Sequence, residues 1–421
     1  MLKASALYMV IIIALVIGVL CSALIVAAYF YQSAYQAKFR ADRLQNNLNS
    51  GINILLTSTD TSYRAERATD LFEDNLDSIS LQRSTWGIFD MGIVKAFAQR
   101  DTIYKVFSIA NAIDSGKWAA LYLIDEDRPL SLSGKTTIRG DAFIPKAGVK
   151  TAYVDNQSYT GDQKLIQGKQ HTSEKKLPPL LSKRLQVIRQ LFHETPEYHS
   201  TLLKSKSIDR SFRYSTTTIS LGKQPGTLQN INLSGNIIIH SDTTLIIDSS
   251  ANLHHVIIFA QAILIKEGFH GNGQFYAKDS ISVERNCKFT YPSCIGVSRD
   301  TIAVIGFPEK ISLGENTQFT GLIFTYQKAN NALPPVITLG KNAVVGGQIY
   351  SQGILSLKAG TNIAGNVMTS RFLYQNAITA YENYLINTTI DASALSRYYL
   401  TSDLSPVSGQ QKKILQWLEV K

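Results

Sequence analysis

Residues 339–371 read LGKNAVVGGQIYSQGILSLKAGTNIAGNVMTSR, and this stretch contains the same unit twice. Leu339 precedes Gly347 by eight residues, and Leu357 precedes Gly365 by eight residues. The two units are therefore 18 residues apart. Each glycine opens a short run of β-favouring residues, which is a pattern typical of stacked short strands.

The same unit extends toward the N-terminus of the chain. Leu313 precedes Gly321 by eight residues, and the next unit begins 26 residues later, at Leu339. The eight-residue excess falls in the polar loop 326–335, where an insertion would not disturb the flanking strands. Three earlier triplets, each with an apolar first and third residue, also follow one another at 18-residue steps: residues 245–247, 263–265 and 281–283.

An 18-residue period with short strands predicts a parallel β-helix in which each unit forms one turn. One unit cannot bury its apolar face alone, whereas stacked units form a continuous core. We expect inward columns of Ile, Leu and Val, with Gly and Asn at the corners. Uneven steps of about 7 and 11 residues favour a right-handed coil over the strict hexads of a left-handed one, without fixing the handedness. On this pattern, the segment resembles the polymer-forming bactofilin class.

The N-terminus carries one long apolar segment. Residues 4–31 read ASALYMVIIIALVIGVLCSALIVAAYFY and contain no charged residue. A membrane-spanning helix needs about 20 apolar residues, and a signal peptide has an apolar region of only about 7–15. We therefore expect a retained anchor rather than a removable signal. The predicted anchor residues are Leu7, Ile12, Leu15, Leu20, Leu24, Tyr29 and Tyr31.

The anchor helix is expected to continue beyond the membrane. Apolar residues recur at three- to five-residue steps with polar residues between them, which indicates an amphipathic helix. At 1.5 Å per residue, a helix from about residue 4 to 56 would be roughly 80 Å long. We expect its second half to pack on a folded domain. The stripe consists of Tyr35, Phe39, Leu44, Leu48, Ile52 and Leu55.

This N-terminal segment resembles the helix of type IV pilin-like proteins, particularly minor pilins and pseudopilins. The likeness is carried by a short basic leader, the sequence Ala4-Ser5-Ala6-Leu7, and the long apolar run. It implies cleavage of the leader by a prepilin peptidase near Ala4 and Ser5. Major pilins have Glu at the fifth position after the cut, where this chain has Met9. The alternative is a plain single-pass anchor with a stalk helix.

The whole chain is expected to be mainly β. Its five expected parts are the anchor and stalk helix (1–57), an α+β region with antiparallel strands (58–130), the start of the coil with a loop and helical insertion (131–229), the parallel β-helix (230–371) and a C-terminal cap (372–421). Helical spacing predicts a helix at about 179–193. The same spacing predicts helices at 374–385 and 412–420, within the cap.

Composition excludes several classes of protein. The chain has 421 residues, of which 44% are hydrophobic and 18% are charged, so it has ample apolar surface to bury and is not disordered. A mean hydropathy of −0.02 excludes a multi-pass membrane protein. Three cysteines exclude a disulfide-stapled mini-domain. The net charge of +10 forms no stripe with interleaved aromatic residues, so we expect no nucleic-acid partner.

The direction of membrane insertion is finely balanced. Lys3 lies before the apolar run, whereas Lys38, Arg40 and Arg43 follow it. The positive-inside count thus leans toward a cytoplasmic body. A coiled β body is typical of the cell envelope, and we therefore expect the opposite orientation. The predicted location is the bacterial inner membrane, with the body periplasmic or extracellular.

Candidate reactive residues are few. Asp248, Glu267 and Glu284 are spaced near one turn apart, as paired carboxylates of a glycosidase would be, but acids also cap turns. Cys287 and Cys294 are close enough in sequence to form a disulfide in an oxidising compartment; the alternative is two small buried residues. The histidines of the coil do not lie a full turn apart. We expect no catalytic residue, metal or cofactor.

Two functions remain open. The first is a non-enzymatic, membrane-anchored structural or assembly protein of the cell envelope, which contacts the lipid bilayer and assembles with itself or with other envelope proteins. The second is a membrane-tethered β-helix that binds or cleaves polysaccharide. A groove with exposed aromatic residues beside paired acids would favour the second function.

Overall fold

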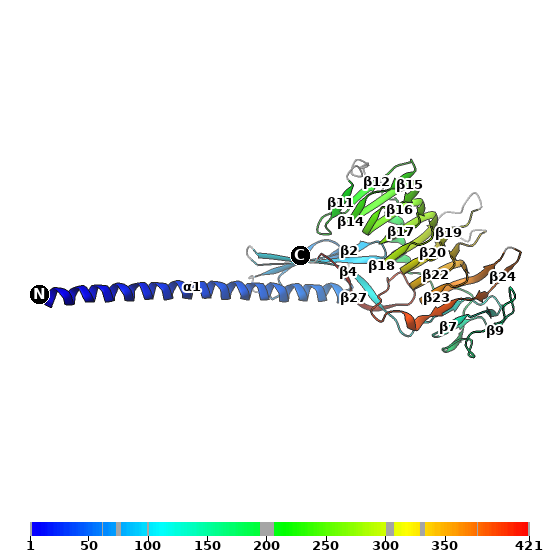
Figure 1. Ribbon diagram of the computed structural model, residues 1–421, viewed down its shortest axis with the longest axis horizontal. Coiled ribbons are helices and arrows are strands. Elements are labelled where there is room, and N and C mark those ends of the chain that lie inside the picture. Colours follow the sequence, from blue (N-terminus) through cyan, green and yellow to red (C-terminus); the bar gives the residue numbers. More distant parts are fainter. Residues whose placement is uncertain are drawn as a thin grey trace. The chain divides into compact units, whose positions relative to one another are not determined.

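The computed structural model describes residues 2–60, 62–72, 77–98, 101–193, 206–299, 307–328, 333–376 and 378–419 (Figure 1). It is 50% strand and 18% helix, so the chain is mainly β as expected. The chain forms two compact units. The first contains residues 1–84 and 92–106, and the second contains residues 85–91 and 107–421.

The first unit is built around the helix α1 (Leu2–Thr57), which confirms the long N-terminal helix. Leu48 and Leu55 are buried on one face of its second half. Gly51 is required on this face, because a Cβ there would lie only 2.7 Å from Val94 Cγ1. The strands of this part of the chain are β1 (Arg67–Thr69), β2 (Ser78–Trp86), β3 (Phe89–Ala98) and β4 (Asp101–Ile113). Their order in the sheet is β1-β2-β3-β4, and β1 is antiparallel to β2.

The second unit is dominated by one closed set of hydrogen-bonded strands, in which most neighbours are parallel. Its central strands are β14 (Asn232–Gly235), β15 (Ile237–Ile247), β16 (Asn252–Ile265), β17 (His270–Val283), β18 (Lys288–Arg299), β19 (Lys310–Leu313), β20 (Gln318–Gln327), β21 (Val336–Leu339), β22 (Val344–Leu357) and β23 (Asn362–Gln375). Shorter strands at its two ends are β11 (Ser207–Arg210), β12 (Thr217–Ser220), β13 (Gly226–Leu228), β5 (Leu121–Leu123), β7 (Thr137–Arg139), β8 (Ala142–Ile144), β10 (Gln170–Thr172), β24 (Ala380–Glu382) and β26 (Thr389–Asp391). A smaller sheet joins β25 (Tyr384–Ile386), β6 (Leu130–Ser133) and β9 (Val149–Thr151) in that order.

The step between neighbouring strands is not uniformly 18 residues. Gln261 and Asp279 are neighbours 18 residues apart, as the repeat predicts. The next steps are 30 residues, from Ser282 to Ser312, and 26 residues, from Asn316 to Asn342. The strands keep their parallel pairing while the sequence intervals between them vary. A strict 18-residue period therefore describes only part of the segment.

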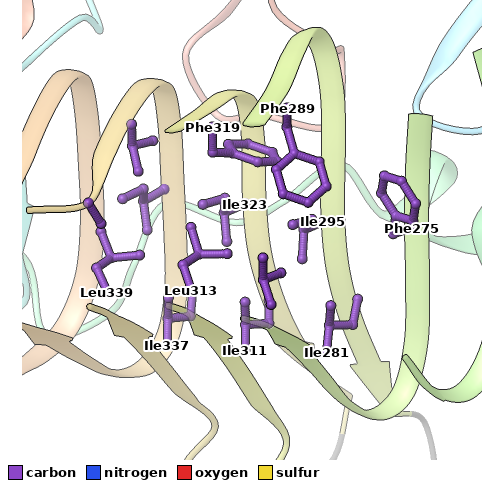
Figure 2. Close-up of a cluster of buried hydrophobic side chains, with 14 of the residues drawn as sticks. Phe275, Ile281, Phe289, Ile295, Ile311, Leu313, Phe319, Ile323, Ile337 and Leu339 are labelled. Atoms are coloured by element: carbon purple, nitrogen blue, oxygen red, sulfur yellow. The ribbon is translucent and has the colours of Figure 1, made fainter. Parts of the chain in front are cut away.

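Apolar side chains form continuous columns inside the closed set (Figure 2). One column runs through paired, fully or almost fully buried residues of β15 to β22: Ile247, Ile265, Val283, Leu313, Leu339 and Leu357. A second contains Phe275, Ile295 and Ile323, which Figure 2 shows on successive strands. Burial of each such side chain contributes about 1.5–3 kcal/mol, so the columns supply most of the driving force for this unit.

Residues 131–139 were expected at the start of the parallel β-helix. In the structure they pair instead with strands at its C-terminal end. Ile390 of β26 pairs with Ile138 of β7, and Leu385 of β25 pairs with Leu132 of β6. Leu121 of β5 pairs with Val367 of β23. Residues 121–139 therefore stack on the last strands of the repeat. At the opposite end of the closed set, β11 pairs with β14, and β12 and β13 pair with β15.

The C-terminal residues correct the predicted helices of the cap. Residues 380–391 form the short strands β24 to β26, and β27 (Ser408–Glu419) replaces the helix expected at 412–420. β27 pairs with β4, whose second half belongs to the same unit. The helix predicted near residues 179–193 is present as α2 (Ser182–His193), with Leu185 and Ile188 buried.

Candidate functional site

The first half of α1 is an uncovered apolar surface. Every described residue from Ala6 to Tyr31 is exposed, and the segment carries no charge. Among the described residues, α1 is the one helix that is long and apolar enough to cross a membrane. An exposed apolar surface of this size marks a site of contact with lipid or protein. All seven predicted anchor residues are exposed: Leu7, Ile12, Leu15, Leu20, Leu24, Tyr29 and Tyr31.

The polar groups of this apolar segment are few. The Ser22 hydroxyl donates a hydrogen bond to the carbonyl oxygen of Gly18 at 2.8 Å. This bond satisfies the hydroxyl within the helix itself, so burying Ser22 in lipid would leave no unmet donor. Cys21 carries a free thiol on the same turn. The first half of α1 is thus compatible with a hydrocarbon environment along its whole length.

Two of the basic residues that follow the apolar segment, Arg40 and Arg43, have partners in the first unit. Arg40 Nε lies 3.4 Å from Asp101 Oδ2, and the Arg43 guanidinium pairs with the buried carboxylate of Asp77. These two cations therefore have a structural role on α1. The predicted cleavage site at Ala4 and Ser5 lies within the helical backbone of α1, and the described side chains of the helix begin at Ala6. Cleavage there stays a prediction.

Of the two alternatives for Cys287 and Cys294, the structure has two buried residues with free thiols and no disulfide between them. Cys294 lies within β18 and Cys287 directly precedes it. A strand rises about 3.3 Å per residue, whereas bonded cysteines need Cα atoms within about 7 Å. Burial raises the pKa of both thiols, so neither is an activated nucleophile.

The three candidate acids at the turns are held by neighbouring groups. The Lys266 amine donates to Glu284 at 2.8 Å, and Arg285 Nε lies 2.8 Å from Glu267. The hydrogen bonds from Lys266 and Arg285 lower the pKa of the Glu284 and Glu267 carboxyls. The Ser250 hydroxyl lowers the pKa of Asp248 in the same way. A general acid needs a raised pKa, so these carboxyls have the properties of turn caps.

Asparagines occupy the turns between these strands, as expected for the corners. Asn316 donates to Asn286 at 3.3 Å, and Asn342 donates to Asn316 at 3.4 Å. All three have positive φ, between 56° and 59°, which asparagine tolerates better than most residues. This ladder binds successive turns to each other. Among the described residues, no group of three or more His, Cys, Asp or Glu is placed to hold a metal ion.

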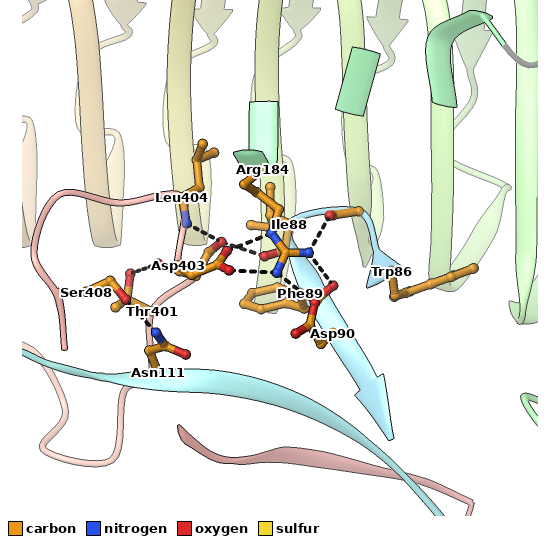
Figure 3. A network of polar contacts seen from close by, with 12 residues as sticks. Trp86, Ile88, Phe89, Asp90, Asn111, Arg184, Thr401, Asp403, Leu404 and Ser408 are labelled. Carbon is orange, nitrogen blue, oxygen red and sulfur yellow. Dashed lines mark hydrogen bonds and ion pairs between the residues drawn. The ribbon is translucent and has the colours of Figure 1, made fainter. Parts of the chain in front are cut away.

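A buried polar site of the second unit surrounds Arg184 of α2 (Figure 3). Its guanidinium contacts Asp403 through two bonds of 2.6 and 2.8 Å and Asp90 through one of 2.7 Å. It also donates to the carbonyl oxygen of Phe89 at 3.0 Å. Burial alone would lower the pKa of Arg184, but the bond to Asp403 and the charges of both acids raise it. The site therefore ties together three segments far apart in the sequence.

Sequence reasoning missed the Arg184 site. On the sequence, Arg184 is one of several cations on the polar face of an amphipathic helix, and neither Asp90 nor Asp403 lies in a motif. The side chain is only 6% exposed, which distinguishes it from Lys183 beside it. The cluster holds no unpaired acid or nucleophile in the part of the chain that is described. It is a structural clamp.

Comparisons with known proteins identify no family for this chain. No family model matches the chain, and no curated protein matches it by sequence. The likeness of the coil to bactofilins therefore gains no support. One similar solved structure is the competence-associated pilin ComZ from Thermus thermophilus, which is 8% identical, covers 82% of this chain and 84% of its own, and has a TM-score of 0.25. A likeness of this size carries no argument about fold or function.

Proposed function

We propose that this chain is a single-pass, membrane-anchored structural or assembly protein of the bacterial cell envelope, with its β body outside the cytoplasm. The observation that carries the proposal is the change of environment along α1. The side chains from Leu7 to Tyr31 are uncovered, whereas one apolar stripe of the second half is buried in the first unit: Leu44, Leu48, Ile52 and Leu55. One continuous helix thus has a half that needs lipid and a half that belongs to a folded domain.

The pilin-like version of this proposal adds processing and assembly. In it, α1 is cut near Ala4 and Ser5, and the exposed helix serves first as an anchor and then as an assembly surface for like or related subunits. Met9 stands where major pilins have Glu, which favours a minor subunit. The support for this version is the leader, the apolar run and its amphipathic continuation in a single 56-residue helix.

We propose further that the β body is a parallel β-helix with a structural rather than a catalytic role. Its support is the parallel pairing of strands 18, 26 and 30 residues apart over continuous apolar columns. Asp248, Glu267 and Glu284 all have lowered pKa values, and Cys287 and Cys294 have raised ones. None of these groups is poised as a general acid or a nucleophile.

Two measurements on the native protein test the proposal. Protease treatment of spheroplasts should degrade the body while a cytoplasmic control protein survives, and the chain should stay with the membrane after a high-salt wash. Mass spectrometry should find a mature N-terminus at Ser5 or Ala6. A protected body would overturn the orientation. An intact Met1 would overturn the pilin-like version and leave the plain anchor.

A further inference from the structure

A cavity of about 520 Å³ lies in the second unit, away from the clamp around Arg184. Its walls come from the end of β11 and the loop after it (residues 209–214), from Ser234 and Gly235 of β14, from His255 of β16 and from the end of β27. Ligand sites typically measure about 300–1,000 Å³ and combine apolar walls with a few placed polar groups. The cavity has the size of a site for a small ligand.

One acid of the cavity is already neutralised. Glu419 Oε2 lies 2.5 Å from Arg213 Nε, and the Arg213 backbone amide donates to Glu419 Oε1 at 3.3 Å. The Ser211 hydroxyl also donates to this carboxylate. Glu419 is therefore engaged on both oxygens and forms a fixed wall of the cavity, with no free charge to offer a ligand.

Arg210 is a cation in the wall of this cavity that has no carboxylate partner among the described residues. Its Nε is buried and has no hydrogen-bond partner, and its guanidinium makes no ion pair with any described residue. The guanidinium lies over the Tyr214 ring, 5.5 Å from the ring centroid, which holds it in place. Buried polar groups without a partner are rare in folded proteins. A planar guanidinium held in this way matches a planar carboxylate.

The other charges of the cavity limit which anion fits. Asp209 is exposed at the rim and has no ion pair in the described part of the chain. Its carboxylate would repel a doubly charged anion such as phosphate more strongly than a single carboxylate, and it would accept hydrogen bonds from hydroxyl groups. Tyr214 is 63% exposed and offers a flat ring at the same opening. The ligand therefore needs one carboxylate, several hydroxyls and a compact ring-shaped body.

We propose that this cavity binds a carboxylate-bearing sugar unit, a uronate of an acidic glycan. The uronate carboxylate pairs with Arg210, its hydroxyls donate to Asp209, and its ring lies against Tyr214. Binding involves no covalent step. The site goes beyond the anchoring function and does not depend on it, because every residue named lies in the second unit.

The test is saturation-transfer NMR on the full chain in detergent micelles, with D-glucuronate as the ligand. D-Glucose is the matched neutral sugar, and acetate, inorganic phosphate and glycine are the anion and zwitterion controls. We expect glucuronate to bind at least about tenfold more tightly than each of these. Equal binding of glucose, tighter binding of phosphate, acetate or glycine, or no signal for glucuronate at millimolar concentration would each overturn the proposal.

Two variants assign the signal to the cavity. Arg210→Gln should weaken glucuronate binding at least about tenfold, and Tyr214→Ala should weaken it as well. Arg397→Gln is the matched control, because Arg397 also lies over a tyrosine, Tyr398, at 5.3 Å but is not one of the residues that line this cavity. Circular dichroism should show each variant folded. Unchanged binding in folded Arg210→Gln, or an equal loss in Arg397→Gln, would overturn the proposal.

Discussion

The backbone of Gly365 lies directly against the carbonyl oxygen of Gly347, and Gly347 lies in the same way against the carbonyl oxygen of Gly321. The three residues pair in register on β20, β22 and β23, with φ values of 146°, 140° and 150°. They are the same glycines that mark the repeat in the sequence. Glycine is required here because any Cβ would overlap the strand before it.

Gly347→Ala should therefore destabilise the second unit. Its Cβ would overlap the Gly321 carbonyl and lie 2.9 Å from the Tyr399 hydroxyl. An unfavourable φ alone costs about 1–3 kcal/mol of unfolding free energy. Denaturant titration of the full chain in micelles should show this loss. Gly346→Ala is the control, because its Cβ would make only an ordinary contact at 3.4 Å with Thr320. Equal stability of the two variants would contradict the stacked-glycine explanation.

Arg184→Met should lower the free energy of unfolding by more than the loss of an ordinary surface charge does. The substitution leaves Asp90 and Asp403 without their buried partner, and breaking such a pair costs about 3–5 kcal/mol. The measurement is the free energy of unfolding, with Lys183→Met as the exposed neighbour on α2. Adding Asp403→Asn to Arg184→Met should restore part of the loss. A cost below that of Lys183→Met would show that the clamp contributes nothing.

Stability should fall in acid partly because of His240. Burial lowers the pKa of His240 from 6.5 to about 4, and its ring stacks on Phe259 at 5.2 Å. The unfolded chain therefore binds this proton more readily than the folded chain does. The contribution is fully present above pH 6.5 and is lost as pH falls toward about 4. His240→Phe keeps a stacked ring and should lose less stability over this window than the wild type.

The comparison that isolates His240 is the difference between each protein's unfolding free energy at pH 7 and at pH 4.5. Carboxyl groups titrate in the same window, but those that do not interact with His240 contribute equally to both proteins; Asp242, whose charge raises the pKa of His240, is the exception. His270→Phe serves as a control at an exposed position of β17. If His240→Phe and His270→Phe lose as much stability as the wild type, His240 does not carry the acid response.

Elements whose residues follow a local repeat or a continuous apolar run could be predicted from the sequence. A charge-free run specifies α1, and the spacing of Gly321, Gly347 and Gly365 specifies the stacked strands. Each signal is local because neighbouring positions on one helix, or equivalent positions on consecutive turns, share one environment. For the same reason the inward columns of Ile and Leu were predictable, and the pairing of Leu339 with Leu357 is one example.

Features that depend on distant pairing were not predictable. Residues 412–420 have apolar spacing that fits a helix, but pairing of β27 with β4 makes them a strand, because strand formation depends on the available neighbour. Nothing local shows that Ile138 pairs with Ile390. The same holds for the partners of Arg184 and for the cavity beside Arg210, both assembled from segments far apart in the chain.

The proposed membrane anchor leads to a direct prediction about where the protein is found in the cell. Replacing Leu15 and Leu20 together with Arg places two charges in the middle of the uncovered half of α1, where both leucines are exposed. Each Arg near the centre of a span costs about 2.5–3.5 kcal/mol of insertion free energy. The double variant should move from the membrane fraction to the soluble or degraded fraction. Leu15→Ala with Leu20→Ala shortens the same side chains without charge and should stay in the membrane. If the double Arg variant remains fully membrane-bound after a high-salt wash, the first half of α1 is not a membrane span, and its apolar surface must instead be covered by protein.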